Sequence, residues 1–382
     1  MKILHICLGN FFNDGYSYQE NLLAKYHKKL GLEVYVIAGL DIFDKNGKIT
    51  YLKSGREYIG DYGIPVKRLN LKNQSRLSKR LRNYSGLKSS LEKIKPDIIF
   101  LHNCQFISII DLIKYLKKHP DTRVYADNHA DFFNSASNWV SKNILHKIIW
   151  RHYAKRIEPF TAKFYGVLPA RVDFLKSVYG LPEEKCELLV MGADDDEVKK
   201  AKKPEVRAEK RKEYGLTDSD FVIMTGGKID HNKRETLQLM DAVNAISNEN
   251  IKLLVFGSVV PELSEEFESR LSEKVRYIGW KKSEDIYSEF AAADLIAFPG
   301  LHSVLWEQAV GMGKPCLFRK IHGFEHVDIG GNCRFIENTS ADSIKSDIEN
   351  CIANTDEMKK AAEKGAEVFS YYNIAKRSLE SE

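Results

Sequence analysis

A glycine turn flanked by two lysines is the clearest candidate for binding an anionic group. Gly226 and Gly227 precede Lys228, and Lys233 follows five residues later, just before a predicted helix. Glycines let a ligand approach the backbone closely, and two lysines flanking a turn can converge on one anion. A diphosphate is the natural ligand for such a turn. The alternative is a solvated turn whose lysines bind nothing.

A second loop, at 298–315, leads into a predicted helix that opens near His302 and Ser303, with Glu307 just over one turn in. Unpaired amides and the positive dipole end at a helix N-terminus suit phosphate oxygens. Glu307 does not suit a phosphate, but its carboxylate could accept hydrogen bonds from the vicinal hydroxyls of a ribose. The alternative is a glutamate on the helix surface.

Two features could indicate metal or redox chemistry, and neither is favoured. Asp194 and Asp196 form a D-x-D pair that could hold Mn²⁺ or Mg²⁺, but a hinge or helix cap is the better interpretation at a domain junction beside a charged connector. The cysteines lack any C-x-x-C spacing, which favours reduced core thiols of a cytosolic protein. We therefore predict no metal. The cysteines are Cys7, Cys104, Cys186, Cys316, Cys333 and Cys351.

Short apolar runs alternate with amphipathic patterns along the whole chain, and these elements must position the loops. This alternation predicts an α/β fold with parallel, doubly wound sheets. The predicted strands are 3–8, 33–38, 66–69, 97–101, 123–126, 163–168, 187–190, 221–225, 252–256, 275–278, 295–298, 315–318 and 333–336. Predicted helices include 19–30, 107–118, 235–246 and 284–292.

The length of 382 residues and the restart of the pattern in the second half predict two Rossmann-like domains. We place the first at 1–192 and the second at 193–365, with a charged connection and an entry helix within 198–214. Ligands bind at the carboxyl ends of parallel strands, so two such domains are expected to face each other across a cleft with binding loops on both walls.

Charge divides unevenly between the halves. Residues 1–190 carry 31 Lys and Arg against 18 Asp and Glu, whereas residues 191–382 carry 27 against 35. The basic first half is expected to meet an anionic partner such as a membrane surface, a phosphate or an acidic glycan. The apolar run at the start predicts a first strand instead of a signal peptide, and no run reaches the length of a spanning helix. We expect a cytoplasmic protein, at most peripheral at the inner face of the plasma membrane.

The segment 67–95 concentrates this charge, with ten basic residues and one acidic residue. Its apolar residues recur at helical steps and predict a basic amphipathic helix that could lie on an anionic membrane surface. The alternative is a helix packed on its own sheet with a solvated basic face. No aromatic stacking platform accompanies the charges, so nucleic acid is not expected. The apolar residues are Leu77, Leu81, Tyr84, Leu87, Leu91 and Ile94.

Five motifs, in order, resemble those of the retaining GT-B glycosyltransferases of family 4. GKIDHNK at 227–233 resembles that family's G-R-L-D-P-x-K loop, and WEQAVGMGKP at 306–315 resembles its L-E-A-M-A-x-G-x-P stretch. MGAD at 191–194, LVFG at 254–257 and YIGW at 277–280 resemble further segments. The resemblance spans most of the chain and implies a GT-B fold, in which two Rossmann-like domains face each other across a cleft.

The resemblance also implies an activity: transfer of a sugar from a nucleoside diphosphate sugar, with retention and without a metal. Lys228 and Lys233 would bind the donor diphosphate and stabilise it as it leaves, beside Gly227. Glu307 would take the donor ribose. Further donor contacts would come from Ser303 and Val304 amides, His302 and the backbone near Trp280. A UDP-sugar is favoured over a GDP-sugar.

On the first-half wall, the resemblance assigns roles to two strand ends. Gly15 matches a family glycine near the donor diphosphate, and the adjacent Tyr16 is a candidate for the acceptor or sugar. His129 matches a family histidine that contacts the donor sugar, with Asp127 beside it. His102 ends another strand and is assigned to the acceptor wall or to a structural role.

One departure from the family concerns its two glutamates, which stand eight residues apart. Eight residues before Glu307 the chain has Pro299, and the loop is shorter, so His302 or Ser303 could occupy the space. This pattern resembles a variant subgroup among capsule and other surface-polysaccharide transferases. The family also predicts that the last segment, 366–382, forms a helix that returns to the first domain.

The resulting hypothesis is a hexosyltransferase-type, metal-independent retaining glycosyltransferase. Its acceptor would be a glycan or polyprenyl-linked saccharide in bacterial capsule, exopolysaccharide or lipopolysaccharide synthesis. One alternative is a nucleotide-sugar epimerase of similar fold, which would need no acceptor. The other is a degenerate nucleotide-sugar-binding partner protein, which would bind without turnover.

Overall fold

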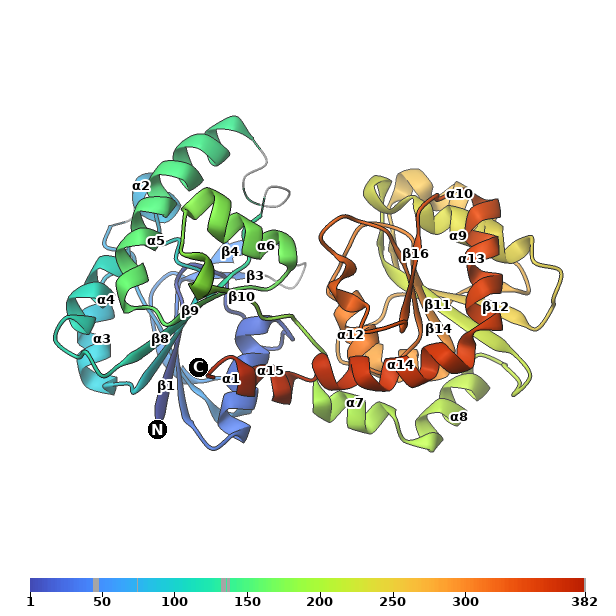
Figure 1. Ribbon diagram of the computed structural model, residues 1–382, viewed down its shortest axis with the longest axis horizontal. Coiled ribbons are helices and arrows are strands. Elements are labelled where there is room, and N and C mark those ends of the chain that lie inside the picture. Colours follow the sequence, from blue (N-terminus) through green and yellow to red (C-terminus); the bar gives the residue numbers. More distant parts are fainter. Residues whose placement is uncertain (44–47, 74, 132–134, 136–137, 381–382) are drawn as a thin grey trace. The chain divides into compact units, whose positions relative to one another are not determined.

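The computed structural model describes residues 1–43, 48–73, 75–131, 135 and 138–380. They divide into two compact units, each an α/β assembly around one main sheet (Figure 1). Unit 1 comprises Met1–Val190 and Ile374–Glu382, and unit 2 comprises Met191–Asn373. No helix among the described residues is both long and apolar enough to cross a membrane.

Unit 1 contains an eight-stranded sheet in the order β10-β9-β8-β7-β1-β2-β6-β5. All neighbours pair in parallel except β5 and β6, which are antiparallel. The strands are β1 (Lys2–Cys7), β2 (Glu33–Ala38), β5 (Glu57–Ile59), β6 (Pro65–Arg68), β7 (Ile98–His102), β8 (Arg123–Asn128), β9 (Lys163–Gly166) and β10 (Cys186–Leu188). A separate hairpin joins β3 (Asp41–Phe43) to β4 (Ile49–Tyr51).

Helices cover this sheet, and strand alternation sends different side chains to its two faces. Leu4 and Ile6 of β1 join the core cluster that includes the helices α3, α4 and α5, whereas His5 points to α1 and the C-terminal helix α15, which lie side by side (Figure 1). The helices are α1 (Gln19–Lys29), α2 (Arg76–Arg80), α3 (Leu87–Ile94), α4 (Ile109–Leu116), η2 (Ser141–Trp150, a π-helical stretch), α5 (Arg151–Ile157), α6 (Pro169–Phe174), η4 (Leu175–Tyr179) and α15 (Tyr371–Arg377).

Unit 2 contains a six-stranded, fully parallel sheet in the order β13-β12-β11-β14-β15-β16. Its strands are β11 (Phe221–Ile229), β12 (Ile251–Val259), β13 (Val275–Tyr277), β14 (Leu295–Phe298), β15 (Cys316–Arg319) and β16 (Cys333–Ile336). Its helices are α7 (Asp195–Ala201), α8 (Pro204–Glu213), η6 (His231–Lys233), α9 (Glu235–Asn244), α10 (Ser264–Glu268), α11 (Ile286–Ala292), α12 (Leu305–Gly311), η8 (Glu325–Val327), α13 (Ala341–Ala353) and α14 (Thr355–Val368).

The predicted α/β class and parallel sheets are confirmed, and each predicted strand is present. Two strands run further than predicted, because β11 and β12 stay paired from Phe221 opposite Ile251 to Ile229 opposite Val259. The pairing needs glycines: Gly257 has φ +115°, and a Cβ there would lie 1.9 Å from the Gly227 carbonyl oxygen. Lys228 therefore lies within β11, and its predicted place in a loop is wrong.

The single amphipathic helix predicted within 67–95 is also wrong. The chain forms β6, the short α2 and α3 instead, with an isolated bridge between Leu71 and Tyr84. Arg82 and Gly86 adopt left-handed backbone conformations, which interrupt a right-handed helix. Tyr84, Leu87 and Leu91 are buried in the core of unit 1, so the alternative of packing on its own sheet describes this segment better.

At the junction, Asp194 caps α7, since its side chain accepts a hydrogen bond from the Asp196 amide at 3.1 Å. The helix-cap interpretation of the aspartate triplet is confirmed. The connection that follows consists of two helices, α7 and α8. All six cysteines are buried.

We expect Gly257→Ala to destabilise unit 2 by about 3–5 kcal/mol, because it adds overlap with a backbone oxygen to the strain of a positive φ. Gly279→Ala is the matched control, since Gly279 has φ +75° and open space around its Cβ position. It should lose only about 1–2 kcal/mol. Urea unfolding of both variants measures the difference, and equal losses would show that the strand approach imposes no constraint.

Candidate active site

In unit 1, polar side chains gather at the carboxyl ends of β7 and β8 and beneath them. His102 ends β7 opposite Asp127 of β8, and His129 follows β8. His5 lies on the same face of the sheet because residues of one face alternate along each strand. His27 comes from the helix α1 that covers this face. The structure thus brings together His102, Asp127 and His129, which were predicted separately.

Hydrogen bonds link these groups from the C-terminal segment to Asp127, and His129 lies in contact with the second oxygen of Asp127. His27 Nε2 lies 3.2 Å from the Ala375 carbonyl oxygen and 2.9 Å from Ser378 Oγ. His27 Nδ1 meets His5 Nε2 at 3.0 Å, and His5 Nδ1 meets His102 Nε2 at 3.0 Å. His102 Nδ1 lies 2.7 Å from Asp127 Oδ2, and Asp127 Oδ1 lies 3.3 Å from His129 Nε2.

The end groups determine where the protons sit. The Ala375 oxygen can only accept, so His27 Nε2 donates to it, and each following imidazole donates toward the C-terminal end. His102 then donates at both nitrogens, to His5 and to Asp127, and is an imidazolium. Burial lowers the pKa of His5, with further lowering by His27, and lowers that of His27 to about 3. Burial also opposes the charge on His102, but Asp127 outweighs it and raises that pKa.

The carboxylate of Asp127 is fully buried and stays ionised. Burial alone would raise its pKa, but His102 and His129 outweigh burial and hold the pKa well below its usual range. Asn103, at φ +66°, accepts a hydrogen bond from the His129 amide at 2.9 Å. The side chain of His129 remains 19% exposed, so it is the member of this group that a ligand could reach.

Ligand atoms of Glu20, His102 and His129 lie within 4.8 Å of one another and could together hold a metal ion. The fit is poor, because both ring nitrogens of His102 are already in hydrogen bonds. Burial also raises the pKa of Glu20, which disfavours the ionised form that a metal requires. Metal independence stays a prediction.

The loop after β1 contains Gly15 and Tyr16. Gly15 has φ +79° with open space at its Cβ position, so its backbone conformation explains the glycine. Tyr16 stacks on Tyr18, with ring centroids 5.2 Å apart. The close approach is made instead by Gly9, where a Cβ would lie 2.5 Å from the Asn103 carbonyl oxygen. Sequence reasoning did not single out Gly9, although it also follows β1.

In unit 2, Lys233 lies at the carboxyl ends of β11 and β14. A Cβ on Gly227 would lie 3.9 Å from Lys233 Nζ, and a Cβ on Gly300 would lie 3.2 Å from Lys233 Cγ. Burial lowers the pKa of Lys233. Lys228 is 66% exposed, and its Nζ lies 3.3 Å from Asp230 Oδ2. The two predicted lysines therefore differ: one is packed between glycines and the other is on the surface.

Glu307 is fully buried in the first turn of α12, so the alternative of a helix-surface glutamate is wrong. Its Oε1 accepts hydrogen bonds from His302 Nε2 at 2.8 Å and from His326 Nε2 at 3.2 Å. Burial would raise its pKa, but the two histidines lower it to about 2. The helix opens at Leu305, with Val304 as N-cap, and not near His302 as predicted. His302 is free of the helix and can turn back to the carboxylate.

His326 was missed by sequence reasoning. It lies in η8, after β15, and β15 pairs with β14, whose loop contains His302. Neighbouring parallel strands place their following loops together, so a histidine after β15 was the available signal. Of the other predicted donor residues, Ser303 directly precedes the N-cap of α12, and Trp280 is 67% exposed in the loop after β13.

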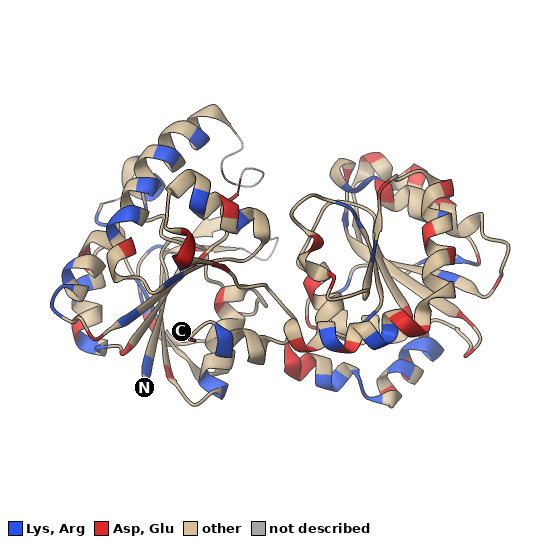
Figure 2. Ribbon diagram, viewed as in Figure 1, with Lys and Arg blue, Asp and Glu red and all other residues tan. Residues whose placement is uncertain are grey.

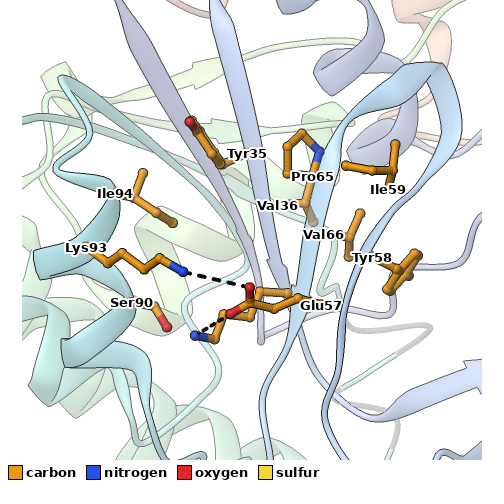
Figure 3. A pocket seen from close by; sticks show the side chains of 11 residues that line it. Tyr35, Val36, Glu57, Tyr58, Ile59, Pro65, Val66, Ser90, Lys93 and Ile94 are labelled. Carbon is orange, nitrogen blue, oxygen red and sulfur yellow. Dashed lines mark ion pairs between the residues drawn. The ribbon is translucent and has the colours of Figure 1, made fainter.

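One well-formed cavity lies away from all of these residues (Figure 3). It occupies about 340 Å³ of unit 1, between the edge strand β5, its neighbour β6 and helix α3. Glu57 projects into it between Lys67 and Lys93, at 2.9 and 3.8 Å from their Nζ atoms. Since no predicted site residue lines it, we assign it no part in the chemistry.

The buried imidazoles predict a stability maximum near neutral pH. Between about pH 5 and 6.5, the unfolded chain protonates His5, His27, His102 and His146, whereas of these four the folded unit protonates His102 only. Stability therefore falls as pH drops below 6.5, by up to about 1.4 kcal/mol per pH unit for each of His5, His27 and His146. Above pH 6.5, the folded unit keeps the proton on His102 that the unfolded chain has lost. Stability therefore falls as the pH rises through the raised pKa of His102.

Urea midpoints of unit 1 at pH 5–8, read from hydrogen exchange in β1 and β7, test this dependence. His27→Gln should lower the slope on the acid side by about a third, since one of the three depressed groups, His5, His27 and His146, is gone. His152→Gln, at an exposed position of the same unit, should keep the slope of the wild type. An unchanged slope in His27→Gln contradicts the assignment of protons.

We expect His326→Ala to destabilise unit 2 by about 3 kcal/mol, because it removes a hydrogen-bond donor from a buried charge. His322→Ala, at an exposed position four residues earlier, should change stability by less than about 0.5 kcal/mol. Chemical unfolding followed by the buried Trp306 measures both. Equal values for the two variants would show that Glu307 does not depend on His326.

Residues 220–354 match the family model described as Glycosyl transferases group 1. This stretch contains Lys228, Lys233, Trp280, Glu307 and His326, and therefore the whole candidate site of unit 2. Among curated protein sequences there is no significant match.

Solved structures resemble the whole chain. A glycosyltransferase from Rickettsia africae matches with a TM-score of 0.67 at 15% identity, covering 99% of this chain and 96% of that one. Anabaena Alr3699/HepE in complex with UDP matches with a TM-score of 0.67 at 17% identity, covering 99% and 98%. UDP-GlcNAc 2-epimerase from Neisseria meningitidis, bound to UDP-GlcNAc, matches with a TM-score of 0.65 at 15% identity, covering 100% and 99%. Identities this low show a shared fold alone. The chain thus has the two-domain GT-B fold, and its second unit contains a segment that matches glycosyl transferases group 1.

Proposed function

We propose that this protein is a retaining glycosyltransferase of the family 4 type that transfers a hexose from a nucleoside diphosphate sugar, preferably a UDP-sugar. The proposed acceptor is a glycan or lipid-linked saccharide in bacterial capsule, exopolysaccharide or lipopolysaccharide synthesis. The proposed setting is the cytoplasm, at the inner face of the plasma membrane. The observation that carries the proposal is the packing of Lys233 between Gly227 and Gly300, within the stretch that matches glycosyl transferases group 1.

Lys233 suits a diphosphate because its ammonium is partly desolvated. Burial lowers the pKa of Lys233, so a diphosphate beside the ammonium would stabilise its charged form. Lys228 is mostly exposed and is expected to contribute less. As the sugar leaves, negative charge grows on the diphosphate, and a fixed cation at that position lowers the barrier. The amides at Ser303 and Val304 are proposed as further diphosphate contacts, with Trp280 near the base.

Glu307 is proposed to contact the donor ribose through one oxygen. Its Oε1 is held by His302 and His326, whereas its Oε2 makes no hydrogen bond to any described residue. Oε2 is thus the atom left to accept from a ribose hydroxyl. Because the carboxylate is fully buried, the loop that contains Gly300 and His302 must move aside for the ribose to reach it.

For unit 1 we propose that His129 contacts the transferred sugar, with Gly15 near the donor and Tyr16, Asp127 and His102 toward the acceptor. The two oxygens of Asp127 hold His102 and His129, so Asp127 and His102 act by positioning His129. The acceptor hydroxyl would attack on the face from which the diphosphate leaves, and a diphosphate oxygen would take its proton. This sequence requires neither a side-chain nucleophile nor a metal.

Nucleotide binding tests the donor site directly. At about a hundred times its Kd, UDP should stabilise the protein by about 2.7 kcal/mol, which corresponds to roughly 5–10 °C in the melting temperature. GDP, ADP and dTDP should give smaller shifts. Lys233→Ala should weaken UDP binding about 10- to 100-fold, because a charge-assisted contact is lost. Lys364→Ala, an exposed lysine of α14, should bind UDP as the wild type does.

Product analysis then separates the possible activities. A glycosyltransferase forms a glycoside and UDP only when an acceptor is present. If the donor is converted when no acceptor is present, the epimerase alternative is favoured. The Neisseria epimerase shares the fold of this chain. UDP binding without turnover of any donor favours a binding partner. If no nucleotide shifts the melting temperature, the diphosphate role of Lys233 is wrong.

A further inference from the structure

A helix of unit 1 presents an apolar stripe to solvent. The stripe lies along the stretch that begins just before η2. Val140, Ile144 and Ile148 recur at steps of four, which places them on one side of a helix, and Trp139 is adjacent to Val140. Large apolar side chains that are mostly exposed are uncommon in such a row. Its members are Trp139, Val140, Ile144 and Ile148, with exposed fractions of 70, 47, 41 and 62%.

The same helix carries only positive charge. No Asp or Glu occurs between Asp131 and Glu158, whereas five basic residues do. Figure 2 shows Lys and Arg repeated along η2 and α5. The basic residues are Lys142, Lys147, Arg151, Lys155 and Arg156. The last four make no ion pair with any residue that the structure describes, so their charge is not neutralised within the chain.

The opposite side of the helix is anchored in the core. His146, Trp150, Ala154 and Ile157 are buried, and His146 Nδ1 lies 3.0 Å from the Tyr179 hydroxyl. The exposed stripe therefore does not result from a loosely placed helix. It is a second apolar side on a helix whose first side already packs on unit 1.

The combination of apolar and basic groups restricts what can cover this stripe. A second copy of the chain would bring the four unpaired cations, Lys147, Arg151, Lys155 and Arg156, against the same four of its partner. A nucleic acid would find a single aromatic ring, Trp139, beside three aliphatic side chains, where stacking needs successive aromatic rings. An anionic bilayer suits both the apolar and the basic groups. The aliphatic side chains and Trp139 enter the interface, and the cations contact the lipid headgroups.

We propose that the helix face of Trp139, Val140, Ile144 and Ile148, with its basic residues, docks this protein on an anionic membrane surface. This replaces the segment 67–95 as the membrane contact. In that segment Leu77 is exposed, but Tyr84, Leu87 and Leu91 are buried, and Lys67 and Lys93 pair with Glu57. The docking rests on the proposed function in one respect, because a lipid-linked acceptor would lie in such a surface. The test of the docking measures membrane binding and does not depend on enzymatic activity.

Co-sedimentation of the full chain with vesicles tests the docking. The wild type should bind vesicles of phosphatidylglycerol and phosphatidylethanolamine, bind vesicles of phosphatidylcholine far less, and be released by 0.5 M salt. Ile144→Asp with Ile148→Asp should lower the partition coefficient more than about tenfold. The triple variant Lys147→Gln, Arg151→Gln and Lys155→Gln should lower it about a hundredfold, at about fivefold per cation.

Leu77→Asp is the matched control, because Leu77 is 64% exposed and Ile148 is 62% exposed. It should bind vesicles as the wild type does. The proposal is overturned if the wild type fails to bind anionic vesicles, or if Leu77→Asp loses as much binding as the helix variants. A dimer that the Ile144 and Ile148 changes dissociate would show that a second copy covers the stripe. UDP stabilisation measured on the same variants reports the donor site separately.

Discussion

Both candidate sites depend on a buried carboxylate held between two histidines. In unit 1 Asp127 lies between His102 and His129, and in unit 2 Glu307 lies between His302 and His326. A buried carboxylate without partners would bind a proton, and each of these instead has a pKa below its usual range. In each pair the carboxylate fixes the orientation of the imidazoles. The candidate site of each unit is thus built on one anion that solvent does not reach.

The parallel sheets explain why such groups meet. Side chains at the carboxyl ends of neighbouring strands lie together, as His102 and Asp127 do on β7 and β8, and as the loops of β14 and β15 do around Glu307. The sheet interior supplies the burial that makes each pairing strong, because water cannot compete there for the hydrogen bonds. The same face of β1 adds His5, which would otherwise be a polar defect in an apolar strand.

Much of this fold follows from local sequence, because apolar runs and amphipathic periods report directly on buried strands and helices. The α/β class with parallel sheets and the strands were predictable on that basis, whereas the GT-B class was implied by the resemblance of five motifs to a known family. The errors arise where the backbone departs from the local pattern. Within 67–95, the left-handed conformations of Arg82 and Gly86 interrupt the predicted helix. In unit 2, glycines allow β11 to continue through Gly227, where a loop was predicted. Lys233 and Glu307 were predictable as polar residues in strand-end loops. His5 and His27 were not, because their partners lie 97 and 351 positions away in the chain.

The histidine chain ends on the segment 375–379, which follows unit 2 in the chain, and this has a consequence for biosynthesis. His27 contacts Ala375 and Ser378, and the Tyr125 hydroxyl donates to the Leu379 carbonyl oxygen. Unit 2 is contiguous and can fold as soon as it has left the ribosome, whereas unit 1 receives these contacts only after residues 375–379 have been synthesised. The half that is made first is therefore completed last, and its buried imidazoles remain open to water for as long as the second half is being synthesised.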